Sequence, residues 1–188
     1  DFQTVLIDET TNEIVVPNGT MGDRHTNPQK WNLRLENRDT GAKIDPRLSV
    51  FDQREDVTVV KLPYFGDEEH EGVIERAIPT ITVQTVDGPV KVTTVYDLIL
   101  ANYGIDRGIG GEVATSYTDD TPYTPTWQEK ITGIKADIAI ATAREFADNA
   151  EKTKGRSMII MGGGINHWYH ADIIYRTILN LIMFCGTE

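Results

Sequence analysis

Three consecutive glycines, Gly162 to Gly164, follow directly on the short apolar run Arg156 to Met161. The run is too short for a helix and fits a buried parallel strand. Helical patterns flank it, from about Ala136 to Lys152 and from about Tyr169 to Phe184. Helix, strand, glycine turn and helix is the order of an α/β layer, in which ligands bind at the carboxyl end of a strand.

The first half of the chain has a different pattern. Apolar and polar residues alternate as in half-buried strands, and turn residues separate the alternating stretches. The predicted strands are Thr4 to Ile7, Glu13 to Val16, Lys30 to Glu36, Val57 to Pro63, Thr80 to Val86 and Val90 to Val95. We therefore predict a β/loop-rich segment over residues 1–93.

Helix signals begin where this segment ends. Thr94 can cap a helix whose third residue is Asp97, and Thr124 with the following proline and Gly133 marks the start and end of a second short helix. We predict an α/β cofactor-binding segment over residues 94–188 and an α/β fold class for the whole. The chain begins with Asp rather than Met, so we expect both segments to belong to a longer protein.

The charge and cysteine content exclude several classes of protein. Acidic residues outnumber basic ones by 29 to 18, and the basic residues are scattered, which argues against a nucleic-acid partner. The single cysteine, Cys185, cannot form an internal disulfide framework or hold an iron–sulfur cluster alone. No stretch reaches the ~18 to 20 apolar residues that a membrane span needs.

The glycine turn is the strongest candidate site. Three glycines permit positive φ and the close approach of a ligand, and a following helix would direct free amides at an anion. The alternative is that the glycines let a strand and a helix pack closely. Neither a P-loop nor the nicotinamide dinucleotide fingerprint is present, because Ile165, Asn166 and His167 stand where those motifs need other residues.

Polar residues are crowded just beyond the glycines. Asn166 and His167 lie at the mouth of the turn and are candidates to face a pocket, although Asn166 could instead cap the following helix. His167 and His170 have the spacing of a metal-binding pair on one helix face, but an obvious third ligand is missing. The pair Asp119 and Asp120 lies in a polar loop and is a weak candidate for catalysis.

The stretch GGGINHWYH, residues 162–170, resembles the corresponding turn in the catalytic alpha subunit of membrane-bound respiratory nitrate reductase. Further blocks agree with that family in the same order. They are VPNGTMGDRH, KWNLRLE, LPYFGDEE, TVYDLILANYGIDRGIGGE, DDTPYTPTWQEKITGI and AREFADNAEKTKGRSMII, and together they extend along essentially the whole chain.

This resemblance implies a fold, a cofactor and a reaction. The family belongs to the molybdopterin oxidoreductases related to dimethyl sulfoxide reductase. It holds molybdenum through two molybdopterin guanine dinucleotides, carries a 4Fe-4S cluster, and reduces nitrate to nitrite in anaerobic respiration. Its molybdenum and cluster ligands lie upstream of such a segment, so no residue here is expected to bind metal. The resemblance places Gly162, Gly163 and Gly164 near the pterin cofactor, and Asn166 and His167 toward the molybdenum and nitrate.

Two alternative functions remain open at this stage. Nitrite oxidoreductase resembles nitrate reductase throughout this region and runs the reverse reaction, and a non-catalytic module that binds a small anion is the alternative from another class. The resemblance further implies an iron–sulfur beta subunit and a membrane-anchor gamma subunit as partners, in a membrane-associated complex on the cytoplasmic face of the cell membrane. The 188 residues alone are expected to be inactive.

Overall fold

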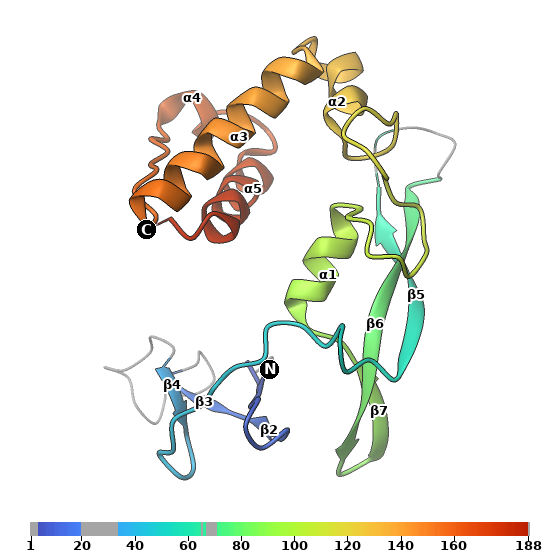
Figure 1. Cartoon of the computed structure of the whole chain (residues 1–188), viewed down its shortest axis with the longest axis vertical. Helices are drawn as coiled ribbons and strands as arrows, with labels where there is room; N and C mark the ends of the chain where they lie inside the picture. The colour runs from blue at the N-terminus through green and yellow to red at the C-terminus, as the bar shows by residue number, and fades with distance from the viewer. Residues whose placement is uncertain (1–3, 20–33, 65, 67–70, 188) are drawn as a thin grey trace. The chain divides into compact units, whose positions relative to one another are not determined.

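The computed structural model describes residues 4–19, 34–64, 66 and 71–187. The chain divides into two compact units, Asp1–Glu112 and Val113–Glu188, and each is described by itself (Figure 1). The architecture is mixed α/β, with small antiparallel sheets in the first unit and helices in both. Helix α1 (Val95–Asn102), which the sequence pattern grouped with the later helices, packs on strand β6 (Val73–Thr85) in the first unit.

A three-stranded antiparallel sheet forms the body of the first unit. Strand β6 pairs on one side with β5 (Asp56–Pro63) and on the other with β7 (Gly88–Val92), so the order is β5-β6-β7. These strands confirm the three predicted between residues 57 and 95. Strand β6 begins at Val73, seven residues before the predicted start at Thr80. The sequence pattern missed this first half because it contains the fully buried Arg76 and shows no apolar–polar alternation.

Two smaller pairs of strands precede the sheet. Strand β1 (Leu6–Ile7) pairs with β2 (Ile14–Val15), which confirms the predicted hairpin, and β3 (Pro17–Asn18) pairs with β4 (Arg34–Asn37). Strand β4 overlaps the end of a predicted strand whose first residues lie outside the described part of the chain. His25 and His70, which the sequence places in polar loops, also lie outside it.

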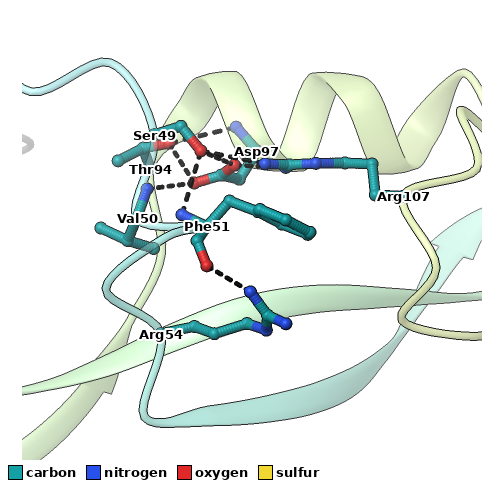
Figure 2. A network of polar contacts seen from close by, with 7 residues as sticks. All are labelled: Ser49, Val50, Phe51, Arg54, Thr94, Asp97 and Arg107. Atoms are coloured by element: carbon teal, nitrogen blue, oxygen red, sulfur yellow. Dashed lines mark hydrogen bonds and ion pairs between the residues drawn. The ribbon is translucent and has the colours of Figure 1, made fainter.

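A buried carboxylate joins helix α1 to two loops (Figure 2). The α1 cap forms as predicted, with the Thr94 hydroxyl accepting from the amide of Asp97 at 3.1 Å. The Asp97 carboxylate itself is fully buried. It accepts hydrogen bonds from Ser49 Oγ at 2.6 Å, Val50 N at 2.9 Å, Thr94 Oγ1 at 2.7 Å and Arg107 Nη1 at 2.5 Å.

These donors decide the ionisation of Asp97. Burial raises the pKa of the carboxyl, but the hydrogen bonds from Ser49, Arg107, Val50 and Thr94 together outweigh burial and hold the pKa below its ordinary value of 3.8. Asp97 is therefore a carboxylate at neutral pH. Arg107 also stacks over the ring of Phe51, with its guanidinium carbon 4.0 Å from the ring centroid.

The second unit is made of helices α2 (Pro125–Thr132), α3 (Ala136–Thr153), α4 (Gly163–Asn166) and α5 (Ala171–Phe184). The ends of α2 are as predicted, because Thr124 accepts from the amide of Trp127 and Gly133 adopts a left-handed conformation. The N-cap residue of α3 makes no side-chain cap bond. A glutamate of α2 supplies one instead, since Glu129 Oε2 accepts from the amide of Ala136 at 2.9 Å.

The predicted buried parallel strand from Arg156 to Met161 is wrong. The segment is irregular, and the side chains of Met158 and Ile160 are 76% and 84% exposed. A parallel strand must share its amides and carbonyls with neighbouring strands, and the described residues of the second unit contain no β-strand. Ser157 anchors the segment to α3 instead, because its hydroxyl donates to the carbonyl of Phe146 at 3.1 Å.

We expect Asp97→Asn to loosen the first unit locally. The variant leaves Arg107 facing a neutral group in a site that is 0% exposed at residue 97, and removing one partner of a buried ion pair costs about 3 to 5 kcal/mol. Amide hydrogen exchange in the complete protein should therefore accelerate at least about tenfold over residues 49–54 and 95–107. Asp52→Asn, an exposed carboxylate of the same loop, is the control. Equal exchange in both variants would contradict the assignment.

The contribution of Asp97 should also depend on pH. Because its pKa is lower in the folded protein than the ordinary 3.8, the carboxylate stabilises the fold above that pH, and this contribution is lost as the pH falls below it. Thermal unfolding followed by circular dichroism should show a gap between wild type and Asp97→Asn at neutral pH. We expect the gap to narrow below about pH 4, and a constant gap would show that the charge is not responsible.

Candidate active site

The glycine turn differs from the predicted conformation. Gly162 is the N-cap of α4 with φ −153° and ψ −159°, Gly163 and Gly164 lie in α4, and none of the three has positive φ. Other residues adopt such backbone angles freely, so the expectation that these glycines provide positive φ is wrong. The backbone conformation therefore does not explain why glycine occupies all three positions.

Packing within the chain does not explain the glycines either. A Cβ atom added at Gly162 or Gly164 would meet no atom of the described structure within 4 Å, and one at Gly163 would meet only His167 Nε2 at 3.8 Å. At Gly155, by contrast, an added Cβ would lie 2.3 Å from the carbonyl oxygen of Gly186. The glycine turn thus exposes bare backbone toward space that the described residues leave open.

Asn166 and His167 follow immediately and are both exposed. Asn166 is the last residue of α4, and its Oδ1 accepts a hydrogen bond from the hydroxyl of Tyr175 on α5. It caps no helix N-terminus, because the N-cap residues of α4 and α5 are Gly162 and His170. The alternative interpretation of Asn166 as a helix cap is therefore wrong.

The two histidines do not form a pair on one helix. His167 ends α4, whereas His170 precedes α5, where its ring meets Tyr169 edge-on at 4.7 Å between centroids. Among the described residues, no group of three or more His, Cys, Asp and Glu side chains is arranged to hold a metal ion. The features that remain at the turn are bare backbone, one amide and one imidazole, which offer hydrogen bonds to a ligand.

The carboxylates at positions 119 and 120 serve the local fold. Asp119 Oδ2 accepts from the amide and hydroxyl of Thr115 and from the amide of Ser116, at 2.8 to 3.0 Å. The Thr115 hydroxyl, followed by the two amides, lowers the pKa of Asp119, which makes it a weaker base. Asp120 pairs with Lys130 of α2. Both carboxylates thus have structural partners and stabilise the conformation of this loop.

A cavity of about 570 Å³ in the first unit is a second candidate, but its lining favours no ligand. Arg47 contributes a positive charge and Glu13 and Glu55 contribute negative ones. Arg47 is already engaged, since its Nη1 donates to Asn12 Oδ1 at 2.7 Å and its Nε lies 3.9 Å from a carboxylate oxygen of Glu9. A small anion would meet opposed charges there, so the glycine turn remains the better candidate.

Two residues have contacts in the structure that the sequence pattern does not reveal. The pattern marks Asp97 only as the third residue of a helix, because its partner Ser49 lies 48 residues away along the chain. No pattern marks Tyr175, because its contact with Asn166 joins two different helices. No spacing rule for a single helix or strand would have found either contact.

Comparison with known proteins identifies relatives over essentially the whole chain. The nitrate reductase alpha chain of Bacillus subtilis (strain 168) is 48% identical over 187 residues, which is 100% of this chain and 15% of the relative. The respiratory nitrate reductase 1 alpha chain of Escherichia coli (strain K12) is 45% identical, over 99% of this chain and 16% of the relative. The nitrate reductase alpha subunit of Mycobacterium tuberculosis (strain ATCC 25618 / H37Rv) is 43% identical, over 99% of this chain and 15% of the relative.

The chain thus spans about 15% of the length of these curated relatives. No protein-family model matches it. No helix in the described part of the chain has the length and apolar character to cross a membrane.

The geometry of the glycines predicts that one of two matched substitutions is neutral and the other destabilising. Gly164→Ala should leave local stability within about 0.5 kcal/mol, because alanine suits a helix and the added methyl group meets no atom. Gly155→Ala, with φ +88° and an added Cβ 2.3 Å from Gly186 O, should cost at least about 1 kcal/mol. Hydrogen exchange over residues 150–170 measures both effects. Equal destabilisation would show that the chain itself needs Gly164.

Proposed function

We propose that this chain, which is homologous along its whole length to one segment of the nitrate reductase alpha chains, belongs to the catalytic subunit of a molybdenum-dependent nitrate reductase. The observation that carries the proposal is the 48% identity to the Bacillus subtilis alpha chain over 187 residues. The reaction is the two-electron reduction of nitrate to nitrite with release of water. The relatives are named as reductases, which favours this direction over nitrite oxidation.

The glycine turn fits a large cofactor. A ligand that lies against Gly162 and Gly164 can approach the backbone itself, in the space that a Cβ atom would fill. We propose that the cofactor is molybdenum bis(molybdopterin guanine dinucleotide), with a 4Fe-4S cluster held by residues outside this chain. When bound, the molybdenum centre supplies the oxygen-atom transfer chemistry. The role of Gly162, Gly163 and Gly164 is to leave the cofactor room.

Asn166 and His167 are proposed to position nitrate. Nitrate offers only hydrogen-bond acceptors, and both side chains carry N–H donors. Both are exposed directly after the glycines, and His167 Nε2 would lie 3.8 Å from a Cβ atom added at Gly163. Donors that are fixed before the substrate arrives hold an oxyanion in place without reorganisation during the reaction. We assign them to nitrate orientation and leave metal binding to residues outside this chain.

The proposal extends to the complex. A nitrate reductase of this family would pass electrons from an iron–sulfur beta subunit to the alpha subunit, and a gamma subunit would anchor the assembly at the cytoplasmic face of the membrane. The nitrate reductase names of the relatives support a respiratory assembly of this kind. Copurification of the tagged complete protein from detergent-solubilised membranes would test it.

Removal of the His167 imidazole tests the site directly. In the complete enzyme, His167→Ala should lower kcat/KM for nitrate by about 10- to 100-fold, because one preorganised donor is lost. Molybdenum per polypeptide, measured by elemental mass spectrometry, should stay unchanged. His170→Ala is the matched control, since that ring packs against Tyr169 outside the proposed site. Unchanged kinetics in His167→Ala would remove it from the site.

The metal content of the wild-type protein tests the function as a whole. The complete protein from its native source should contain close to one molybdenum per polypeptide and reduce nitrate with a reduced viologen dye as the electron donor. Intact protein without molybdenum would overturn the proposal and favour a module that binds a small anion. Molybdenum-containing protein that oxidises nitrite but does not reduce nitrate would reverse the assigned direction.

A further inference from the structure

A side-chain hydrogen bond joins helices α4 and α5 at the proposed site. The hydroxyl of Tyr175, on α5, donates a hydrogen bond to Oδ1 of Asn166, the last residue of α4. Tyr175 is half-buried, whereas Asn166 is exposed. The tyrosine thus holds the Oδ1 end of the amide, and Nδ2 takes no part in this hydrogen bond.

The orientation of this amide matters for an oxyanion. An asparagine side chain carries an acceptor oxygen at one end and a donor NH2 group at the other, and a rotation of about 180° about its last bond exchanges them. Nitrate can only accept hydrogen bonds, so an amide that presented Oδ1 would repel it. In the structure the phenol donates to Oδ1, so Nδ2 is the end of the amide that can donate to an oxyanion.

We infer that Tyr175 is a positioning residue of the proposed nitrate site, whose hydroxyl fixes the Asn166 amide so that Nδ2 faces the substrate oxyanion. The inference rests on the proposed function and deepens it. Tyr175 needs no contact with nitrate or with the cofactor for this role. It acts only through Asn166, and this separates it from a residue that supports the helices.

The first test is Tyr175→Phe in the complete enzyme, which removes the hydroxyl and keeps the ring. The lost hydrogen bond should raise KM for nitrate about three- to tenfold, because the amide then spends part of its time in the wrong orientation. We expect kcat within about twofold, since orientation affects bound substrate and transition state alike. Tyr117→Phe, at a 62% exposed tyrosine of the same unit, should change neither constant.

A double-mutant cycle separates positioning from structural support. In an Asn166→Ala background there is no amide to orient, so the further change Tyr175→Phe should leave KM unchanged. An additive increase in KM, or loss of molybdenum in Tyr175→Phe alone, would show that the tyrosine supports the fold and would overturn the inference.

Failure of the inference can be told from failure of the proposed function. If the wild type reduces nitrate and Asn166→Ala raises KM, but Tyr175→Phe behaves like wild type, the inference is wrong and the function stands. If Asn166→Ala itself leaves KM unchanged, Asn166 has no role in binding nitrate and the inference falls with it. If the wild type reduces no nitrate, both are overturned.

Discussion

The buried carboxylate of Asp97 is the interaction on which the first unit depends. A charge without solvent access must be met by hydrogen bonds, and here four donors converge on it from the loop at Ser49 and Val50, from Thr94 and from Arg107. The loop before β5 and the loop after α1 are therefore both hydrogen-bonded to Asp97, in the first turn of α1. Replacement of any donor would leave the same charge less satisfied, so the group is expected to act as one cooperative cluster.

The second unit is held together differently. None of the helices α2, α4 and α5 has a buried residue, α3 buries only Ala150, and large apolar side chains such as Ile173 and Met183 remain more than half exposed in the described structure. The candidate site lies in this unit. Its open backbone and these apolar side chains are left uncovered by the described residues.

The sequence predicted features that depend on neighbouring residues, such as helix caps. It did not predict features that depend on residues distant along the chain, such as strand pairing. The predicted helix starts at Thr94 and Thr124 were correct because each threonine hydroxyl accepts from the amide only three residues further along the chain. The strand at Arg156 to Met161 was wrong because pairing needs partners that a single stretch cannot reveal. For the candidate site, the sequence identified the glycines, Asn166 and His167, whose roles remain predictions. The hydrogen bond between Tyr175 and Asn166 joins two helices and became visible only in three dimensions.

The segment from residue 155 to residue 166 lies close to α5, or to the residues just beyond it, at both of its ends. Near one end of the segment, Gly155 lies so close to the Gly186 carbonyl, just beyond α5, that no side chain would fit. At the other end, the hydroxyl of Tyr175 donates a hydrogen bond to Asn166. The segment from residue 155 to residue 166 thus leaves α3 and returns to α5 with both of its ends beside the same helix. A displacement of α5 would therefore press the Gly186 carbonyl against Gly155 or strain the hydrogen bond between Tyr175 and Asn166.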